Sequence, residues 1–304
     1  MILIMVFDCT IRRPAALAAA SLALVGCAAV SRASADDGRI HVVATVYPLA
    51  EAAQRVGGDV VAVDSLAAPG VEPHDLELTP HQVEAIDEAD LVLYVGGGFQ
   101  PGVEDALAEA SGVMLDATSF VRRPADEGAL PDPHVWLDPT LFGRIVDEVS
   151  DALSDVDPAH AETFGGNAEN HLRQLEALDA DYRRGLADCD RRLIVSSHGA
   201  FGYLAARYGL MQVSISGSSP EAEPTPQRID ELRDVVEREG LTTIFTEELA
   251  SPEAAETLAA ETGATTAVLS PLESLTQEEL SIGANYVSVM RENLGRLRDA
   301  LGCA

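Results

Sequence analysis

Short apolar runs alternate with amphipathic segments along two stretches of the chain. Within residues 39–117, runs such as 60–67 and 90–98 are typical of buried strands, and segments such as 78–89 have the apolar spacing of helices. Residues 191–270 repeat this order of strand, helix and strand. The alternation predicts an α/β fold of two lobes, each a parallel sheet flanked by helices.

A long amphipathic segment separates the two stretches. Its apolar residues recur at three- and four-residue spacing: Leu172, Leu175, Leu178, Tyr182 and Leu186. This spacing indicates one apolar face on a helix of about 30 residues, about 45 Å long. We expect this helix to join the two lobes, and we expect His171 on it to be exposed.

The pattern divides the chain into five predicted parts. They are a lipoprotein signal peptide (1–26), a flexible tether (27–38), an N-terminal α/β lobe (39–154), a linking long helix (155–188) and a C-terminal α/β lobe (189–304).

The N-terminal segment has the features of a targeting signal. Two arginines precede an apolar run too short to cross a bilayer comfortably, and the run ends in "LVGC" at residues 24–27. Small residues directly before a cysteine resemble a bacterial lipoprotein signal, in which Cys27 would be lipidated as the first mature residue. A plain secretory signal cut near residues 33–35 is the alternative. We therefore expect an extracytoplasmic protein that is lipid-anchored to the cell membrane.

Charge and cysteine content narrow the function further. The net charge is −30 and all twenty basic residues are arginine, so the composition disfavours nucleic acid, whose phosphates attract a positive surface. Outside the N-terminal segment only Cys189 and Cys303 remain. In an oxidising compartment such a pair is most simply a disulfide bond, here one that closes a long loop.

Three of the seven histidines share a position relative to the predicted elements. His74 follows a strand in "VEPHDLELTP", His134 precedes a helix in "DPHVWLDP", and His198 ends the strand "RRLIVSSHG". In open parallel sheets, ligands bind beyond the carboxyl ends of the strands. Three imidazoles and one carboxylate form a closed tetrahedral set for a zinc-like ion. The sequence therefore predicts a metal site between the lobes.

The chain resembles a known family, the substrate-binding lipoproteins of zinc and manganese ABC importers. The resemblance rests on "VEPHDLELTP", "ADLVLYVGGGFQP", "DPHVWLDP", "SSHGAFGYLAARYGL", "IFTEEL" and "NYVSVMRENLGRLRDAL", which occur in family order. It implies two lobes bridged by a long helix, with His74, His134 and His198 at the ligand positions. Glu273 lies nearest the fourth position, and Glu248 or a water molecule are the alternatives.

The resemblance implies a binding protein and not an enzyme. We expect it to be a monomer that captures a divalent metal, most simply zinc, and delivers it to an ABC permease. Zinc is the expected cargo, because three imidazoles favour it over manganese. A manganese receptor, a metal-dependent adhesin and a secreted zinc hydrolase are the alternatives. The sequence gives the hydrolase little support, because it contains neither H-E-x-x-H nor G-x-S-x-G.

Overall fold

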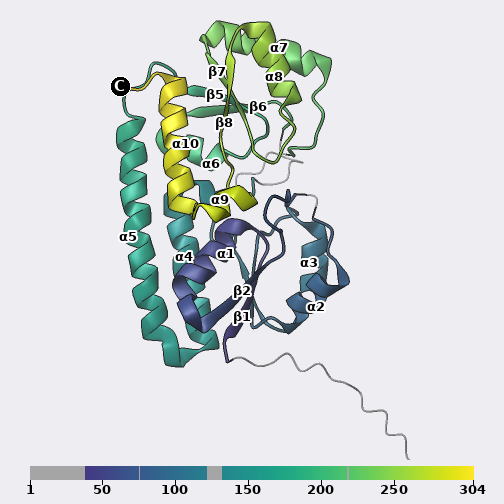
Figure 1. The fold of residues 1–304 in the computed structure, drawn as a ribbon, viewed down its shortest axis with the longest axis vertical. Coiled ribbons are helices and arrows are strands. Elements are labelled where there is room, and N and C mark those ends of the chain that lie inside the picture. The colour runs from purple at the N-terminus through teal and green to yellow at the C-terminus, as the bar shows by residue number, and fades with distance from the viewer. Residues whose placement is uncertain (1–37, 75, 122–131, 218) are drawn as a thin grey trace, which may run out of the picture. The chain divides into compact units, whose positions relative to one another are not determined.

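The computed structural model describes residues 38–74, 76–121, 132–217 and 219–304. The predicted signal peptide, Cys27 and the tether up to residue 37 lie outside these described residues. Residues 38–304 form one unit, which contains two parallel sheets with helices packed on them (Figure 1). The predicted fold class is confirmed.

Each sheet has four parallel strands, and the two sheets have the same kind of order. The first is ordered β2-β1-β3-β4 and consists of β1 (Ile40–Ala44), β2 (Val61–Ser65), β3 (Leu91–Tyr94) and β4 (Val113–Asp116). The second is ordered β6-β5-β7-β8 and consists of β5 (Leu193–Ser196), β6 (Met211–Ser214), β7 (Thr243–Thr246) and β8 (Thr265–Val268). In both sheets the chain order reverses around the strand that comes first in sequence, which is where ligand sites form in open parallel sheets.

The helices follow the strands in the alternation that the sequence predicts. They are α1 (Tyr47–Gly57), α2 (Pro80–Glu88), α3 (Pro101–Leu107), α4 (Pro139–Val156), α5 (Ala161–Gly185), α6 (Gly202–Tyr208), α7 (Pro226–Glu239), α8 (Glu253–Thr262), α9 (Gln277–Ser281) and α10 (Tyr286–Leu301). Short 3-10 turns span Gly58–Val60, Val135–Leu137 and Pro158–His160. Among the described residues, no helix is long and apolar enough to cross a membrane.

The long helix α5 packs against helices from both halves of the chain. Its 25 residues span about 37 Å, and it contacts α1, α4 and α10 (Figure 1). The predicted apolar face is largely buried, and the hydroxyl of Tyr182 donates to the carbonyl of Met290 on α10 at 2.6 Å. The main hydrophobic cluster takes residues from both halves of the chain, so one core stabilises the two sheets together.

The expectation for His171 is wrong, because the side chain is only 2% exposed. It lies on the buried face of α5, at helical spacing from Ala168 and Leu175. The sequence carried this signal, since His171 continues the same stripe.

The end of the chain is fixed to the start of the second sheet. Cys189 and Cys303 form a disulfide bond across 114 positions of sequence. The bond closes the end of α10 onto the segment that leads into β5. This is the pairing that the cysteine count predicts.

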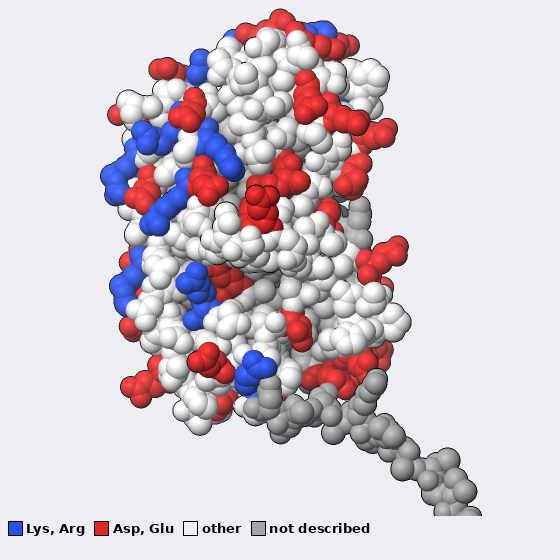
Figure 2. All heavy atoms as spheres, in the orientation of Figure 1, with Lys and Arg blue, Asp and Glu red and all other residues white. Residues whose placement is uncertain are grey.

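The surface charge is unevenly distributed. Figure 2 shows acidic side chains spread over the face in view, whereas arginines gather on the side formed by α5 and α10. Three of them, Arg184, Arg291 and Arg298, line one depression with Asp181. Asp181 pairs with both Arg184 and Arg291, so one acid on α5 offsets part of this arginine cluster.

Candidate metal centre

Four side chains converge where the carboxyl ends of the two sheets face each other. His74 lies in the loop after β2, and His134 directly precedes the 3-10 turn that leads into α4. His198 follows β5, and Glu273 lies in the loop after β8. Strand order therefore brings together residues that are up to 199 positions apart in sequence.

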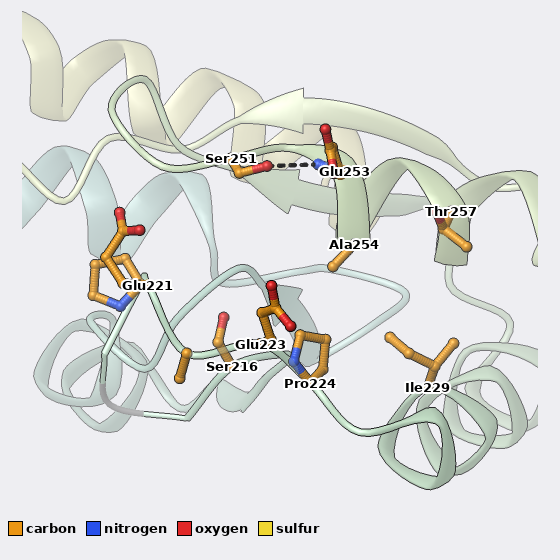
Figure 3. A pocket seen from close by; sticks show the side chains of 11 residues that line it. Ser216, Glu221, Glu223, Pro224, Ile229, Ser251, Glu253, Ala254 and Thr257 are labelled. Carbon is orange, nitrogen blue, oxygen red and sulfur yellow. Dashed lines mark hydrogen bonds between the residues drawn. The ribbon is translucent and has the colours of Figure 1, made fainter.

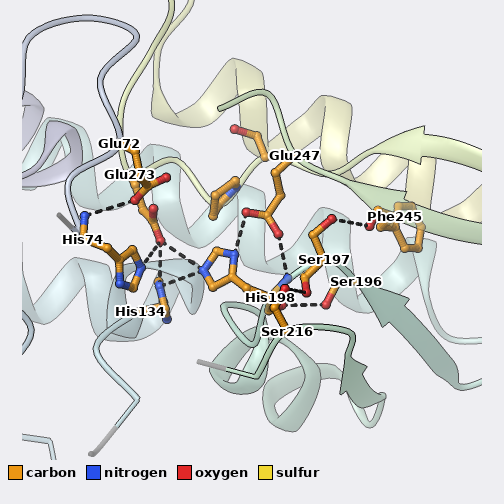
Figure 4. A network of polar contacts seen from close by, with 12 residues as sticks. Glu72, His74, His134, Ser196, Ser197, His198, Ser216, Phe245, Glu247 and Glu273 are labelled. Carbon is orange, nitrogen blue, oxygen red and sulfur yellow. Dashed lines mark hydrogen bonds and ion pairs between the residues drawn. The ribbon is translucent and has the colours of Figure 1, made fainter. Parts of the chain in front are cut away.

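The distances define a site the size of one ion. One ligand atom from each of the four residues lies within 4.8 Å of all the others. Oε1 of Glu273 is 3.2 Å from Nε2 of His74, 2.7 Å from Nε2 of His134 and 3.3 Å from Nε2 of His198 (Figure 4). His134, His198 and Glu273 are fully buried, and the His74 side chain is 11% exposed.

Two further carboxylates orient the imidazoles. Nδ1 of His134 lies 2.8 Å from Oδ1 of Asp132, and Nδ1 of His198 lies 2.6 Å from Oε2 of Glu247. A carboxylate accepts hydrogen bonds, so each Nδ1 carries a hydrogen, and Nε2, which faces Glu273, can bind an ion once it has released its own proton. This arrangement is the one that metal-binding histidines use in proteins.

The site attracts positive charge. Burial alone would raise the pKa of the Glu273 carboxyl, but hydrogen bonds from His134, His198 and His74 bring it well below its usual range. Burial lowers the pKa of His198, yet the bonds to Glu247 and Glu273 raise it to about 10. The pKa of His134 is raised in the same way by Asp132 and Glu273.

A third acid lies next to the cluster. Oε1 of Glu72 accepts a hydrogen bond from the backbone N–H of His74 at 3.1 Å. Burial and the charge of Glu273 raise the pKa of the Glu72 carboxyl to about 8. Glu72 thus contacts the backbone of His74, and Glu273 is the acid whose oxygen lies against Nε2 of all three histidines.

The competing acid of the sequence, Glu248, does not join this cluster. Burial raises the pKa of its carboxyl, and its hydrogen-bond partners are Ser270 and its own backbone. Its neighbour Glu247 instead faces His198. Sequence reasoning missed Asp132 and Glu247, although the signals were an acid two residues before His134 and two consecutive acids at the end of β7.

The remaining described histidines lie outside the cluster. His81 is exposed on α2, and exposed His160 lies 2.6 Å from the carboxylate of Asp157. His41 is partly buried in β1. His171 is buried in the core against Phe142, with ring centroids 5.9 Å apart.

A separate cavity of about 440 Å³ lies in the second half of the chain, between the loop after β6 and the start of α8 (Figure 3). Glu221, Glu223 and Glu253 line it together with small and apolar side chains. None of the four clustered residues lines this cavity. This cavity is therefore not the candidate metal site.

The fold and the buried cluster define a two-lobed protein in which one group of the described residues could hold a metal ion. The chain belongs to the ZnuA family, described as "zinc-uptake complex component A, periplasmic", whose sequence model matches residues 42–300.

Two similar proteins and one solved structure agree with this family. The zinc-binding lipoprotein AdcA of Streptococcus pneumoniae is 38% identical over 296 residues, 92% of this chain and 59% of AdcA. The chain thus spans less than two thirds of that relative. The high-affinity zinc uptake system protein ZnuA of Bacillus subtilis is 34% identical, covering 94% of this chain and 96% of ZnuA. The Zn(II)-bound ZnuA-like domain of S. pneumoniae AdcA has a TM-score of 0.76 at 39% identity, covering 87% of this chain and 99% of that domain.

Proposed function

We propose that this chain binds a zinc ion through His74, His134, His198 and Glu273 and delivers it to an ABC permease. The observation that carries the proposal is the convergence of three Nε2 atoms on one carboxylate oxygen within a buried site. Four protein ligands complete a tetrahedral shell and leave no open position for a reactive water. Such a site suits capture and transfer of an ion and not hydrolysis.

The donor set favours zinc over manganese. Imidazole nitrogen suits zinc, whereas manganese prefers more oxygen ligands, and the general order of affinities also places zinc above manganese. We expect the metal-depleted protein to bind zinc with high affinity and to bind manganese far more weakly. A competition titration tests this, and manganese displacing zinc at comparable concentration would contradict the assignment.

Delivery to a permease requires a test in cells. A strain without the protein should grow poorly in zinc-depleted medium and recover with the wild-type chain. The His198→Ala variant should not restore growth, whereas His81→Ala should. Equal rescue by both variants would contradict the proposed role of the cluster.

We also propose that the protein is anchored outside the cytoplasm through a lipid on Cys27. The supporting observation is the "LVGC" sequence after an apolar run. The Cys27→Ala variant should move from the membrane fraction to the soluble extracytoplasmic fraction. Unchanged membrane association would contradict the anchor.

A further inference from the structure

One buried side chain connects the loop of His134 to the loop of Glu273. Trp136 lies two residues after His134 and is fully buried. Its indole N–H donates to the carbonyl oxygen of Pro271 at 2.8 Å, two residues before Glu273. The two loops are 135 positions apart in sequence, and this hydrogen bond joins them directly beside the cluster.

The backbone of Trp136 is itself held in place. Its carbonyl oxygen accepts a hydrogen bond from the hydroxyl of Tyr286 at 2.5 Å. The backbone N–H of Tyr286 donates to Oε2 of Glu51 at 2.7 Å, and Tyr286 is fully buried at the start of α10. The backbone at Trp136 therefore cannot shift without breaking this buried hydrogen bond to α10.

The segment that the indole holds is strained at one residue. Leu272 lies between Pro271 and Glu273 and has a φ of 58°, the only positive φ among the described non-glycine residues. An aliphatic side chain rarely adopts this conformation, which persists only where the surroundings impose it. The backbone carbonyl of Glu273 is fixed on the other side by the N–H of Tyr47 at 3.1 Å.

We propose that Trp136 is a positioning residue that places the Glu273 carboxylate among the three histidines. The indole N–H holds the carbonyl of Pro271, and the N–H of Tyr47 holds the carbonyl of Glu273. These two fixed points impose the left-handed turn at Leu272, which lies between them. This inference rests on the proposed function, because it assigns Trp136 a role in the same metal site. It predicts that Trp136 influences metal affinity through Glu273 and not through general stability.

The Trp136→Phe variant tests the proposal, since phenylalanine keeps an apolar ring and removes the N–H donor. Zinc affinity, measured by competition with a chromophoric chelator, should fall about tenfold, as expected when one buried hydrogen bond is lost. In the Glu273→Gln background the same substitution should have little further effect, because the carboxylate it positions is gone. The control Tyr182→Phe, which removes a buried hydroxyl that donates to Met290, should lower the melting temperature and leave zinc affinity unchanged.

Independent losses in the double variant would overturn the proposal, as would wild-type affinity in a folded Trp136→Phe protein. If that variant does not fold, Tyr286→Phe removes the hydrogen bond to the Trp136 carbonyl and should weaken zinc binding to a smaller extent. Zinc affinity in a folded Tyr286→Phe protein equal to that of the wild type would then overturn it.

The proposed function and the positioning role can fail separately. If the wild-type protein binds no zinc, the proposed function is wrong. The positioning role can then be tested without metal, because Oε1 of Glu273 contacts three imidazoles without any ion. The measurement is the free energy of unfolding of the wild type, Trp136→Phe, Glu273→Gln and the double variant. Additive losses would overturn it, and coupled losses would support it.

Discussion

His198 and His171 are both buried imidazoles, but their surroundings are opposite. His198 has Glu247 on one ring nitrogen and Glu273 on the other, and its pKa is raised to about 10 despite burial. Among the described residues neither ring nitrogen of His171 has a hydrogen-bond partner, and burial lowers its pKa. Burial alone therefore does not make a histidine a ligand. Carboxylates on both ring nitrogens distinguish His134 and His198 from His171.

The largest expected effect comes from removing an imidazole of the cluster. His134→Ala or His198→Ala should lower zinc affinity by more than the 10- to 100-fold that is typical of losing an outer partner, because each removes a direct bond to the ion. Titration of metal-depleted protein measures this. The matched control is His171→Ala, which also removes a buried imidazole but should leave zinc affinity unchanged. Equal losses from His198→Ala and His171→Ala would break the comparison.

A smaller effect is expected from the acid behind His198. The two oxygens of Glu247 accept from Nδ1 of His198 at 2.6 Å and from its backbone N–H at 3.1 Å. Glutamine offers only one acceptor oxygen, so Glu247→Gln leaves one of these donors facing an amide N–H. We expect a loss of zinc affinity of about 10- to 100-fold.

The neighbouring acid provides the control for this prediction. Glu248→Gln has the same change in chemistry one position away, outside the cluster, and should leave zinc affinity near the wild-type value. If Glu248→Gln weakened binding as much as Glu247→Gln, Glu248 would return as a candidate ligand.

The acid behind His134 sharpens the comparison further. The Asp132 side chain is 30% exposed, against 3% for Glu247. Water can replace a lost acceptor at the more exposed position, so Asp132→Asn should cost less zinc affinity than Glu247→Gln. The ratio of the two losses is read from the same competition titrations. A larger loss at Asp132 would mean that exposure does not set the size of the effect.

Sequence reasoning predicted the parts of the molecule that periodicity and chain order control. The strand and helix alternation, the helix within residues 78–89 and the positions of His74 and His198 after strands follow from local pattern. In the structure Thr79 caps α2, with its hydroxyl accepting from the N–H of Gln82. His74 and Glu273 lie 199 positions apart in sequence. Their convergence follows from the rule that ligand sites form beyond the carboxyl ends of parallel strands.

What sequence reasoning missed depends on side-chain direction. Glu247 and Glu248 are adjacent, and successive residues along an extended chain point to opposite sides, so only the register of β7 in its sheet decides which acid faces His198. The left-handed turn at Leu272 carries no sequence signature, because leucine does not favour it. The buried position of His171 follows from its spacing in the stripe of α5, although histidine is a polar residue.

The smallest expected effect concerns His171 and is a test of stability, not of binding. Because the folded-state pKa of His171 lies below the usual value near 6.5, the unfolded chain binds a proton that the folded chain excludes. His171 therefore lowers the stability as pH falls through about 6.5, until its folded-state pKa is reached. The charges that act on it are those of Glu51 and Arg55, and neither forms a hydrogen bond to the ring.

His171→Leu replaces the ring with an apolar side chain of similar size and removes two buried polar atoms without partners. We expect a gain of about 1 kcal/mol at pH 7.5, and a larger gain at pH 5.5 because the leucine does not titrate. Urea unfolding of metal-free wild-type and variant protein at both pH values measures the difference, with exposed His81→Gln as the control. The contributions of the site histidines cancel in this difference, since both proteins contain them. A gain that shrinks at pH 5.5 would mean that His171 is protonated in the folded protein, and the contrast with His198 would then be lost.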